Sequence, residues 1–332
     1  MHIYYSDTHL PHDPQSDWEV AARATMILDE LGKANLGTFK QPDDFGMDPI
    51  TAVHDQKMLH FLQNAFTQMQ AEKKMSEVIP NCFATRHLDG HLPQTIWGQL
   101  GYYCTDSTTP IMARTWEAAY WAVQTTLSTT QHVLQNRNTA YALCRPPGHH
   151  AYADLYGGYC YLNNVAIAAH WLTAQQQKVA IVDVDYHHGN GTQAIFYDRD
   201  DVLFCSIHAD PDQDYPFYSG FEGETGHGAG LGYNHNYPLP LGTNGRTYLE
   251  TLQQAIQNVA QFNPDILLIS LGVDTAKGDP NGEFLLEQGD FAAMGQLFAQ
   301  VDLPKVVVQE GGYILDSIGK NVHAFLQNIL SL

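Results

Sequence analysis

Short apolar runs recur along the chain, and segments with helical periodicity separate several of them. The runs are rich in Val, Ile and Leu, which is typical of strands buried on both faces of a parallel sheet. A shorter run at residues 2–5 can open such a sheet. The other runs cover residues 139–143, 178–182, 202–207, 265–271 and 305–308.

Segments with apolar residues every three or four positions predict amphipathic helices. One begins near Asp55, and two others cover residues 115–134 and 163–175. Ser16 and Glu19 have the spacing of a capping box, so we expect a further helix to start there. Strand, helix, strand units of this kind indicate an α/β fold with a parallel sheet.

Residues 79–110 show no helical periodicity and are rich in Pro, Gly, Asn, Thr and His. A loop of that length in a compact domain is usually functional or disordered, and its aromatic residues favour order. No linker marks a boundary elsewhere. We therefore expect residues 1–332 to form one domain with a long functional loop at about 79–110.

The charge balance narrows the class of partner. The 332 residues include 16 Lys and Arg against 36 Asp and Glu, a net charge of −20. Such a surface repels phosphate backbones and anionic lipid and attracts cations, so no nucleic-acid or membrane partner is expected. Five cysteines without a CxxC pair fit isolated thiols in a reducing compartment. With no signal-peptide pattern and no long apolar segment, the expected location is cytoplasmic.

Polar residues follow the run at 178–182. In an open α/β sheet the carboxyl ends of the strands form the ligand-binding edge. Residues two apart in an extended chain point the same way, so Asp185 and His187 can converge on one point and suit a divalent metal ion. The alternative is that Asp183 and Asp185 cap the next helix and that the histidines are solvated.

Three other predicted strands end in groups of the same kind. Their carboxyl ends reach the same edge of a parallel sheet, so these groups can approach the first set. They are His149 and His150 after residues 139–143, Asp274 after 265–271, and Tyr313 after 305–308.

Together these groups fit amide hydrolysis. Asp185, His187 and Asp274, called the metal triad below, supply three protein ligands and leave an open coordination position, as a catalytic site requires. Metal-activated water that attacks an amide needs a base, an acid and a donor for the oxyanion. The two adjacent histidines and Tyr313 offer those roles.

The loop at residues 209–231 is acidic and aromatic. It is either a solvated acidic face or the lip of a pocket for a cation. Its carboxylates are Asp210, Asp212, Asp214, Glu222 and Glu224.

These motifs resemble the histone deacetylase superfamily, and most closely its bacterial acetylpolyamine amidohydrolases. The resemblance covers nearly the whole chain. It implies an arginase/deacetylase-like three-layer α/β fold with a central parallel sheet, helices on both faces, and one catalytic zinc ion. The motifs are PPGHH at 146–150, GGYCYLNN at 157–164, DVDYHHGNGTQ at 183–193, SLGVDT at 270–275 and EGGY at 310–313.

The resemblance also implies roles. The metal triad matches the zinc ligands, and Tyr313 matches the tyrosine that stabilises the oxyanion. His150 matches the general base and acid, and His149 its electrostatic partner, oriented by Asp183. Asn190 stands beside His150 where several histone deacetylases carry Asp, so we expect a less basic His150.

Arginases share this fold but hold two manganese ions through D-x-H-x-D and D-x-D. Gly189 and Ala276 stand two positions beyond His187 and Asp274. A second metal ion would therefore lack its carboxylates, and a mononuclear site is expected.

Further positions follow from the same resemblance. Tyr159 and Tyr215 match the aromatic walls of the substrate channel, and the carbonyl of Gly158 matches the acceptor for the scissile amide N–H. Two structural potassium ions are implied as well. Their positions are Asp183, Asp185, His187, Ser206 and Ile207 for one, and Phe196, Arg199, Val202 and Tyr233 for the other.

Departures from the pattern concern the substrate. Residues 98–104 resemble the loop with which dimeric acetylpolyamine amidohydrolases narrow their channel, so a homodimer through the 79–110 loop is expected. Trp97 and Thr108 stand where the matched enzymes carry Glu, and Asn281 near the rim is neutral too.

The expected substrate is a small cationic acetylated amine, with acetyl-lysine peptides as the alternative. A catalytically inactive protein that binds metal or ligand is disfavoured because no catalytic group is missing.

Overall fold

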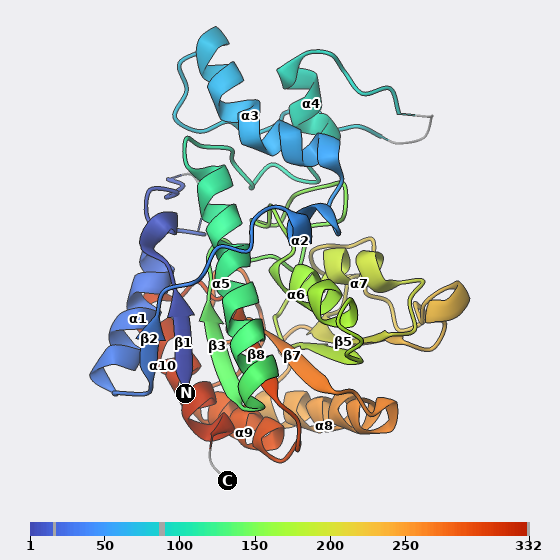
Figure 1. Ribbon diagram of the computed structural model, residues 1–332. Helices are drawn as coiled ribbons and strands as arrows, with labels where there is room; N and C mark the ends of the chain where they lie inside the picture. The colour runs from blue at the N-terminus through green and yellow to red at the C-terminus, as the bar shows by residue number, and fades with distance from the viewer. Residues whose placement is uncertain (16–17, 86–89, 331–332) are drawn as a thin grey trace.

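The computed structural model describes residues 1–15, 18–85 and 90–330 (Figure 1). Over these residues its centre is a sheet of eight parallel strands in the order β2-β1-β3-β8-β7-β4-β5-β6. The strands are β1 (His2–Tyr5), β2 (Thr38–Lys40), β3 (Thr139–Leu143), β4 (Val179–Asp183), β5 (Val202–Ala209), β6 (Asn234–Leu239), β7 (Ile266–Leu271) and β8 (Lys305–Gln309).

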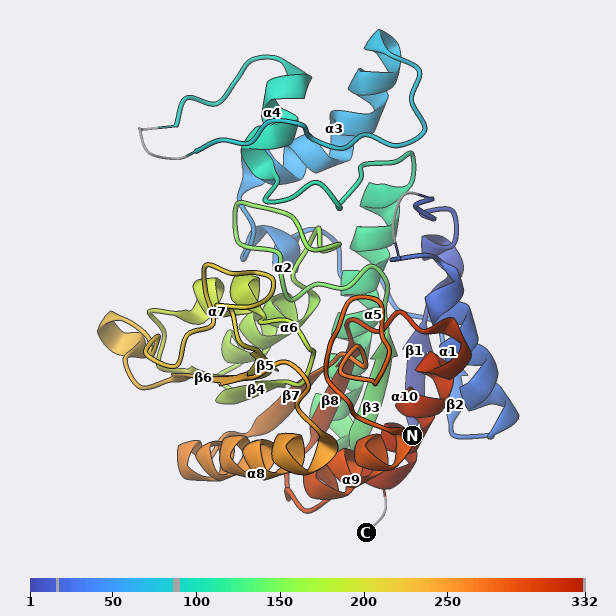
Figure 2. The ribbon, with the colours of Figure 1, turned by 180° about the vertical axis from the view of Figure 1, so that it is seen from behind.

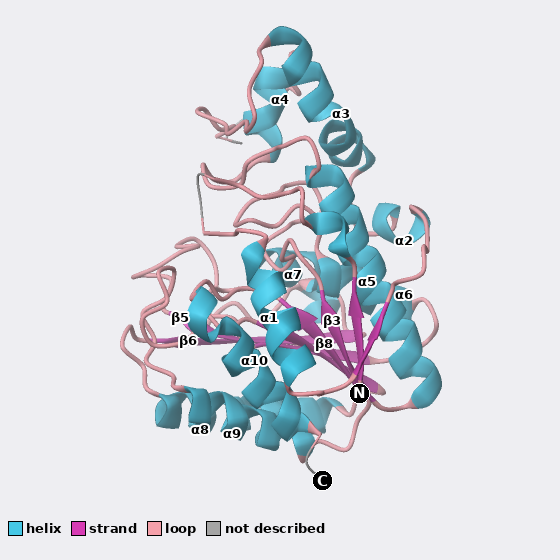
Figure 3. Ribbon diagram, turned by 90° about the vertical axis from the view of Figure 1, so that its left-hand side faces the viewer, coloured by secondary structure: helices cyan, strands magenta, loops and turns pink. Residues whose placement is uncertain are grey.

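Helices cover both faces of the sheet, and Figure 3 shows the resulting three layers with the strands nearly edge-on. The predicted α/β fold is therefore confirmed. One face packs against α1 (Ala22–Lys33), α8 (Gly245–Phe262), α9 (Gln288–Ala299) and α10 (Leu315–Ile329). The other face packs against α5 (Thr115–Asn136), α6 (Asn164–Thr173) and α7 (Asn190–Phe196).

Side-chain alternation explains why the central strands are apolar throughout. In β4, Ala180 and Val182 belong to the core shared with α8, α9 and α10. Val179 and Ile181 point the other way, into the core shared with α5 and α6. A strand covered on both faces has apolar residues at every position instead of alternating apolar and polar residues. This continuous apolar run is the pattern from which the sequence predicted the strand.

A lobe containing α3 (Gln56–Glu72) and α4 (Ile96–Tyr103) lies beyond the carboxyl ends of the strands (Figures 1 and 2). The helix predicted near Asp55 is confirmed, because the Asp55 carboxylate accepts the N–H groups of Lys57 and Met58 at 2.8 and 3.0 Å and so caps α3. Short elements are α2 (Asp48–Thr51) and two 3₁₀ turns, Asp7–His9 and Gly228–Gly230. Within the described residues, no helix is long and apolar enough to cross a membrane.

The absence of a helix from residues 79–110 was predicted wrongly, because α4 lies there. Thr95 caps it by accepting the N–H of Gly98 at 3.3 Å. Gly101 allows the helix to pass the backbone carbonyl of Cys82, where a Cβ atom would overlap. Two glycines in eight residues weaken the helical signal, so packing rather than propensity forms this helix.

The helix start predicted at Ser16 and Glu19 is placed too early. Ser16 lies outside the described residues, and α1 begins later, at Ala22. The buried Glu19 carboxylate instead pairs with the guanidinium groups of Arg23 at 2.7 Å and Arg145 at 2.8 Å. Glu19 therefore anchors two buried cations.

Candidate active site

The polar groups identified in the sequence analysis follow four neighbouring strands of the sheet. β3, β8, β7 and β4 lie side by side at the centre of the sheet. Because all four are parallel, their carboxyl ends open at one edge. The groups that follow them, in that order, are His149 with His150, Tyr313, Asp274, and Asp185 with His187.

The three ligand atoms of the metal triad all lie within 4.8 Å of one another. His187 Nδ1 is 3.3 Å from Asp185 Oδ1 and 3.3 Å from Asp274 Oδ2. Both carboxylates are fully buried, and Asp274 Oδ2 has no hydrogen-bond partner among the described residues. A buried carboxylate oxygen without a partner is costly unless a cation binds it. This donor set therefore fits a divalent metal ion.

The charges around the triad support the same conclusion. Burial raises the pKa of Asp183, and burial together with the negative charge of Asp185 raises the pKa of Asp274. At Asp185 itself, burial is outweighed by positive charge on His149 and His187, which lowers its pKa. A divalent cation would neutralise this crowded buried charge.

Two glycines let the backbone approach the triad. The N–H of Gly311 donates to Asp185 Oδ2 at 2.8 Å. A Cβ atom at Gly311 or Gly272 would overlap the Asp185 carboxylate. The glycines of the SLGVDT and EGGY motifs therefore have a steric role beside the candidate metal ligands.

The adjacent histidines have different partners and different charges. His149 Nδ1 donates to the Asp183 carboxylate at 2.9 Å. Burial lowers the pKa of His149, but the negative charges of Asp185 and Asp183 outweigh burial and raise this pKa to about 10. His150 Nδ1 donates to the side-chain oxygen of Asn190 at 2.7 Å. Burial and the neighbouring histidines hold the pKa of His150 well below its usual value. Its Nε2 is then free to accept a proton.

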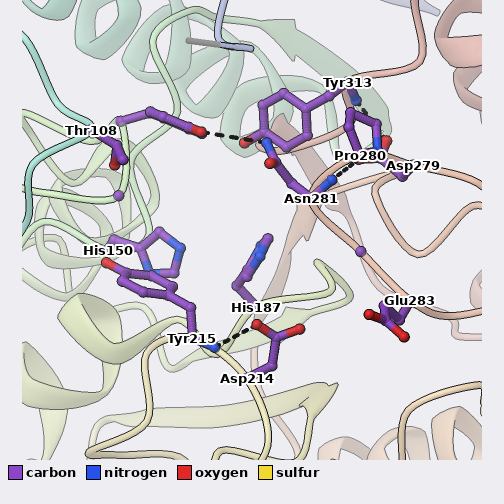
Figure 4. Close-up of a pocket in the computed structure, with 13 residues that line it drawn as sticks. Thr108, His150, His187, Asp214, Tyr215, Asp279, Pro280, Asn281, Glu283 and Tyr313 are labelled. Carbon is purple, nitrogen blue, oxygen red and sulfur yellow. Dashed lines mark hydrogen bonds between the residues drawn. The ribbon is translucent and has the colours of Figure 1, made fainter.

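His150, His187 and Tyr313 line a cavity of about 460 Å³ (Figure 4). Tyr215 packs edge-on against His150 with ring centroids 5.0 Å apart, and Tyr159 packs against Tyr313 at 5.6 Å. The two tyrosines predicted as channel walls thus flank the candidate catalytic groups. The cavity is lined by Thr108, His150, Gly158, Tyr159, His187, Asp214, Tyr215, Asp279, Pro280, Asn281, Gly282, Glu283 and Tyr313.

Two residues that the sequence analysis did not single out position Tyr313. Its backbone N–H donates to Asp279 Oδ2 at 2.8 Å, and the Arg23 guanidinium lies 4.6 Å from its ring centroid. Burial raises the pKa of Tyr313, so the phenol stays protonated and can donate. Asp279 follows Asp274 in one loop, which was the only sequence signal for it. Arg23 lies too far away in the chain to be linked to the site by spacing.

A third missed residue, Asp106, holds the turn at Gly158 and Tyr159. Both turn residues have positive φ, 57° and 64°. The N–H of Gly158 donates to Asp106 Oδ2, and the N–H of Tyr159 donates to Thr109 Oγ1 at 2.9 Å. A Cβ atom at Gly158 would overlap the His150 ring. The long loop thus fixes the turn that carries the Gly158 carbonyl.

Glu310 joins three strand ends and was also missed, although its EGGY motif was recognised. Its Oε2 accepts the N–H groups of Gly148 at 2.7 Å and His149 at 3.3 Å. Its Oε1 accepts the Ser270 hydroxyl at 3.2 Å. Burial raises the pKa of Glu310 to about 7. This carboxyl therefore positions the backbone that carries the adjacent histidines.

The neutral positions noted in the sequence lie in different places. Thr108 and Asn281 line the cavity. Trp97 lies on α4 and is absent from the lining; its indole N–H donates to Glu72, and the Lys73 ammonium lies 4.8 Å from its ring centroid. Of the three, only Thr108 and Asn281 can contact a ligand in this cavity.

The residues of the two implied potassium sites fall into two groups. In the first, Asp183 and Ser206 are directly paired between β4 and β5. In the second, the Phe196 carbonyl accepts the N–H of Arg199 at 3.0 Å, and the Tyr233 carbonyl accepts the N–H of Phe204 at 2.9 Å. Phe196, Arg199 and Val202 therefore lie along the connection from α7 to β5, and Tyr233 contacts β5.

Comparisons with known proteins agree with this geometry. A sequence model described as the histone deacetylase domain matches residues 17–329. Acetylpolyamine amidohydrolase 1 of Pseudomonas aeruginosa is 45% identical over 335 residues that cover 97% of each chain, and the enzyme of Mycoplana ramosa is 38% identical over 99% of each. A crystal structure of the acetylpolyamine aminohydrolase of Burkholderia pseudomallei superposes with a TM-score of 0.95 at 38% identity, covering 100% of this chain and 99% of that one.

Proposed function

This chain belongs to the histone deacetylase family, and we propose that it removes acetyl groups from acetylated primary amines, with acetylpolyamines as substrates and one zinc ion as cofactor. One observation carries the proposal. His187 of the metal triad, His150 and Tyr313 line a single cavity at the edge of the sheet, and the buried Asp185 and Asp274 lie beside His187.

Zinc suits the donor set. Ligand atoms bound to a tetrahedral zinc ion at about 2.0–2.2 Å stand roughly 3.4 Å apart. The 3.3 Å separations between His187 Nδ1 and the two carboxylate oxygens agree with this spacing. Gly189 and Ala276 offer no carboxylate for a second ion, which supports a mononuclear site.

A zinc ion held there would supply Lewis acidity that activates water and polarises the acetamide carbonyl. His150 Nε2 takes the proton of the attacking water and later delivers a proton to the leaving nitrogen, so that acetate and an amine are released as the C–N bond breaks. The Tyr313 hydroxyl donates to the oxyanion, and the Gly158 carbonyl accepts the N–H of the scissile amide. His149, held as a cation beside Asp183, stabilises negative charge next to His150.

The alternative substrate is an acetyl-lysine peptide. The family includes histone deacetylases, such as histone deacetylase 8 of Arabidopsis thaliana, which is 38% identical over 229 residues covering 65% of this chain. Relatives named for acetylpolyamines match nearly the full chain at 38–45% identity, which supports the polyamine assignment.

The test compares acetate release from acetylputrescine, acetylcadaverine and a flexible acetyl-lysine peptide by the purified, zinc-loaded protein. We expect turnover of all three with a preference for the diamines. Inert acetylpolyamines beside an efficiently processed peptide would replace the proposal by the lysine deacetylase alternative. Inertness of all three would contradict deacetylation of amines.

Further proposals concern the assembly and setting of the enzyme. Two structural potassium ions would be held by the two groups of residues described above, as their clustering supports. A homodimer would form through the 79–110 loop, supported by the projecting α3–α4 lobe and the exposed side chains of Met75 and Phe83.

We place the enzyme in the cytoplasm, because its five cysteines are free thiols. Residues 1–332 would act as one deacetylase domain, as the extent of the family match supports.

A further inference from the structure

One side of the cavity carries two carboxylates, one from the acidic 209–231 loop and one, Glu283, that the sequence analysis did not single out. Asp214 and Glu283 line the cavity, and among the described residues its lining contains no Lys or Arg. In Figure 4 both lie on the side of the cavity away from Thr108. Thr108 and Asn281 are neutral. The third carboxylate of the lining, Asp279, is buried, and its two oxygens accept the backbone N–H groups of Asn281 and Tyr313, so the carboxylates left for a ligand are Asp214 and Glu283.

Two different loops bring these carboxylates together around one ring. The Tyr186 hydroxyl donates to Asp214 Oδ2 at 2.5 Å. The ring of Phe284, which follows Glu283 in the chain, packs edge-on against Tyr186 with centroids 4.8 Å apart. Tyr186 therefore links the loop after β5 to the loop after β7.

The two carboxylates differ in how they are held. Asp214 is half-buried, and its Oδ1 accepts the N–H of Tyr215 at 2.7 Å, so both of its oxygens are oriented. A carboxylate oxygen accepts more than one hydrogen bond, so Asp214 keeps capacity for a ligand. Glu283 is exposed and can approach a ligand from the mouth.

The cavity is a ligand site independently of this acidic side. His187 of the metal triad lines it, and beside His187 the fully buried Asp274 Oδ2 lacks a hydrogen-bond partner among the described residues. A substrate acetamide that reaches the triad must therefore extend its remaining chain past Asp214 or Glu283, or past the neutral rim.

We propose that Asp214 and Glu283 select the substrate by binding the ammonium group at the far end of an acetylated diamine. This inference rests on the proposed function, because it presupposes an acetamide at the metal triad. The methylene chain of the diamine lies between the aromatic walls Tyr159 and Tyr215, and no cationic side chain in the described part of the lining competes for the carboxylates. Acidic residues at new positions thus replace the glutamates missing at Trp97 and Thr108.

The experiment separates charge from shape by using two substrates of one length. Acetylputrescine carries a terminal ammonium, and N-pentylacetamide carries a methyl group in its place. Glu283→Gln should lower kcat/KM for acetylputrescine up to about fivefold, mainly through KM, because an exposed ion pair contributes at most roughly that factor. The N-pentylacetamide value should stay within about twofold of the wild type.

Glu222→Gln is the matched control, because Glu222 is an exposed carboxylate of the 209–231 loop that does not line the cavity. It tests whether the overall charge of the protein, rather than the position of Glu283, attracts the cation. A charge reversal, Glu283→Lys, should weaken acetylputrescine further and favour N-acetyl-4-aminobutyrate, which ends in a carboxylate. Asp214→Asn should act in the same direction as Glu283→Gln, but it also weakens the Tyr186 hydrogen bond, so the Glu283 variants carry the test if it fails to fold.

The outcomes distinguish this inference from the proposed function. If the wild type releases acetate from acetylputrescine but Glu283→Gln affects both substrates equally, or neither, the inference is overturned and the deacetylase assignment stands. An effect of Glu222→Gln as large as that of Glu283→Gln would also overturn it. If the zinc-loaded wild type releases acetate from neither compound nor from acetyl-lysine peptides, the proposed function itself fails.

Discussion

The floor and the rim of the cavity are built in different ways. The floor consists of the metal triad, His150 and Tyr313, which follow central strands and are buried or nearly so. The rim consists of Thr108, Asn281 and Glu283, which lie in loops and are exposed or half-buried. At the floor, a change leaves a buried charge or donor without its partner. At the rim, water can replace a lost contact, so selection among substrates can change while the chemistry stays.

The largest effect is expected from removal of a ligand at the floor. Asp274→Ala should abolish metal binding and activity together, a loss greater than the roughly 10²-fold typical of residues next to metal ligands. The protein should remain folded, because the substitution also removes a crowded buried carboxylate. Elemental analysis and circular dichroism check this, with the exposed Asp302→Ala as control. Stoichiometric metal in Asp274→Ala would contradict the ligand assignment.

A smaller loss is expected when the floor keeps its metal but loses one donor. Tyr313→Phe should reduce kcat on the order of 10²–10³-fold, the usual result of removing an oxyanion donor. Metal content and substrate binding should be unchanged. Near-normal turnover would mean that another group stabilises the oxyanion.

Asp106 connects the two regions, because it lies in the long loop yet holds the N–H of Gly158 beside His150. Asp106→Ala should free the turn at Gly158 and Tyr159 and lower kcat/KM about tenfold, since displaced positioning groups commonly cost this much or more. The loss should appear with neutral and cationic acetamides alike, which separates positioning from charge recognition. A loss confined to cationic substrates would instead assign Asp106 to substrate binding.

The smallest effect is expected at the rim. Asn281→Glu should raise the preference for acetylputrescine over an acetyl-lysine peptide about fivefold, as expected for one partly exposed charge pair of ~1 kcal/mol. Competition between the two substrates in one reaction measures the ratio directly. An unchanged ratio would mean that position 281 does not contact the amine.

The sequence predicted the central strands well and the sheet edges poorly. Strands β3, β4, β5, β7 and β8 were all found as apolar runs, because each is covered on both faces. The edge strand β2 has three exposed residues, and the other edge strand, β6, contains Pro238. Edge strands need neither a continuous apolar pattern nor every backbone N–H, so local pattern did not reveal them.

The sequence by itself determined which residues could perform the chemistry, because each motif places a carboxylate, an imidazole or a phenol just after a buried strand. Only the tertiary structure decided that β3, β8, β7 and β4 are neighbours, since strand order depends on packing between segments far apart in the chain. The same holds for Arg23 beneath Tyr313 and for Asp106 beside Gly158. It also holds for Asp214 and Glu283, whose shared position around Tyr186 depends on contacts between two loops that no local spacing encodes.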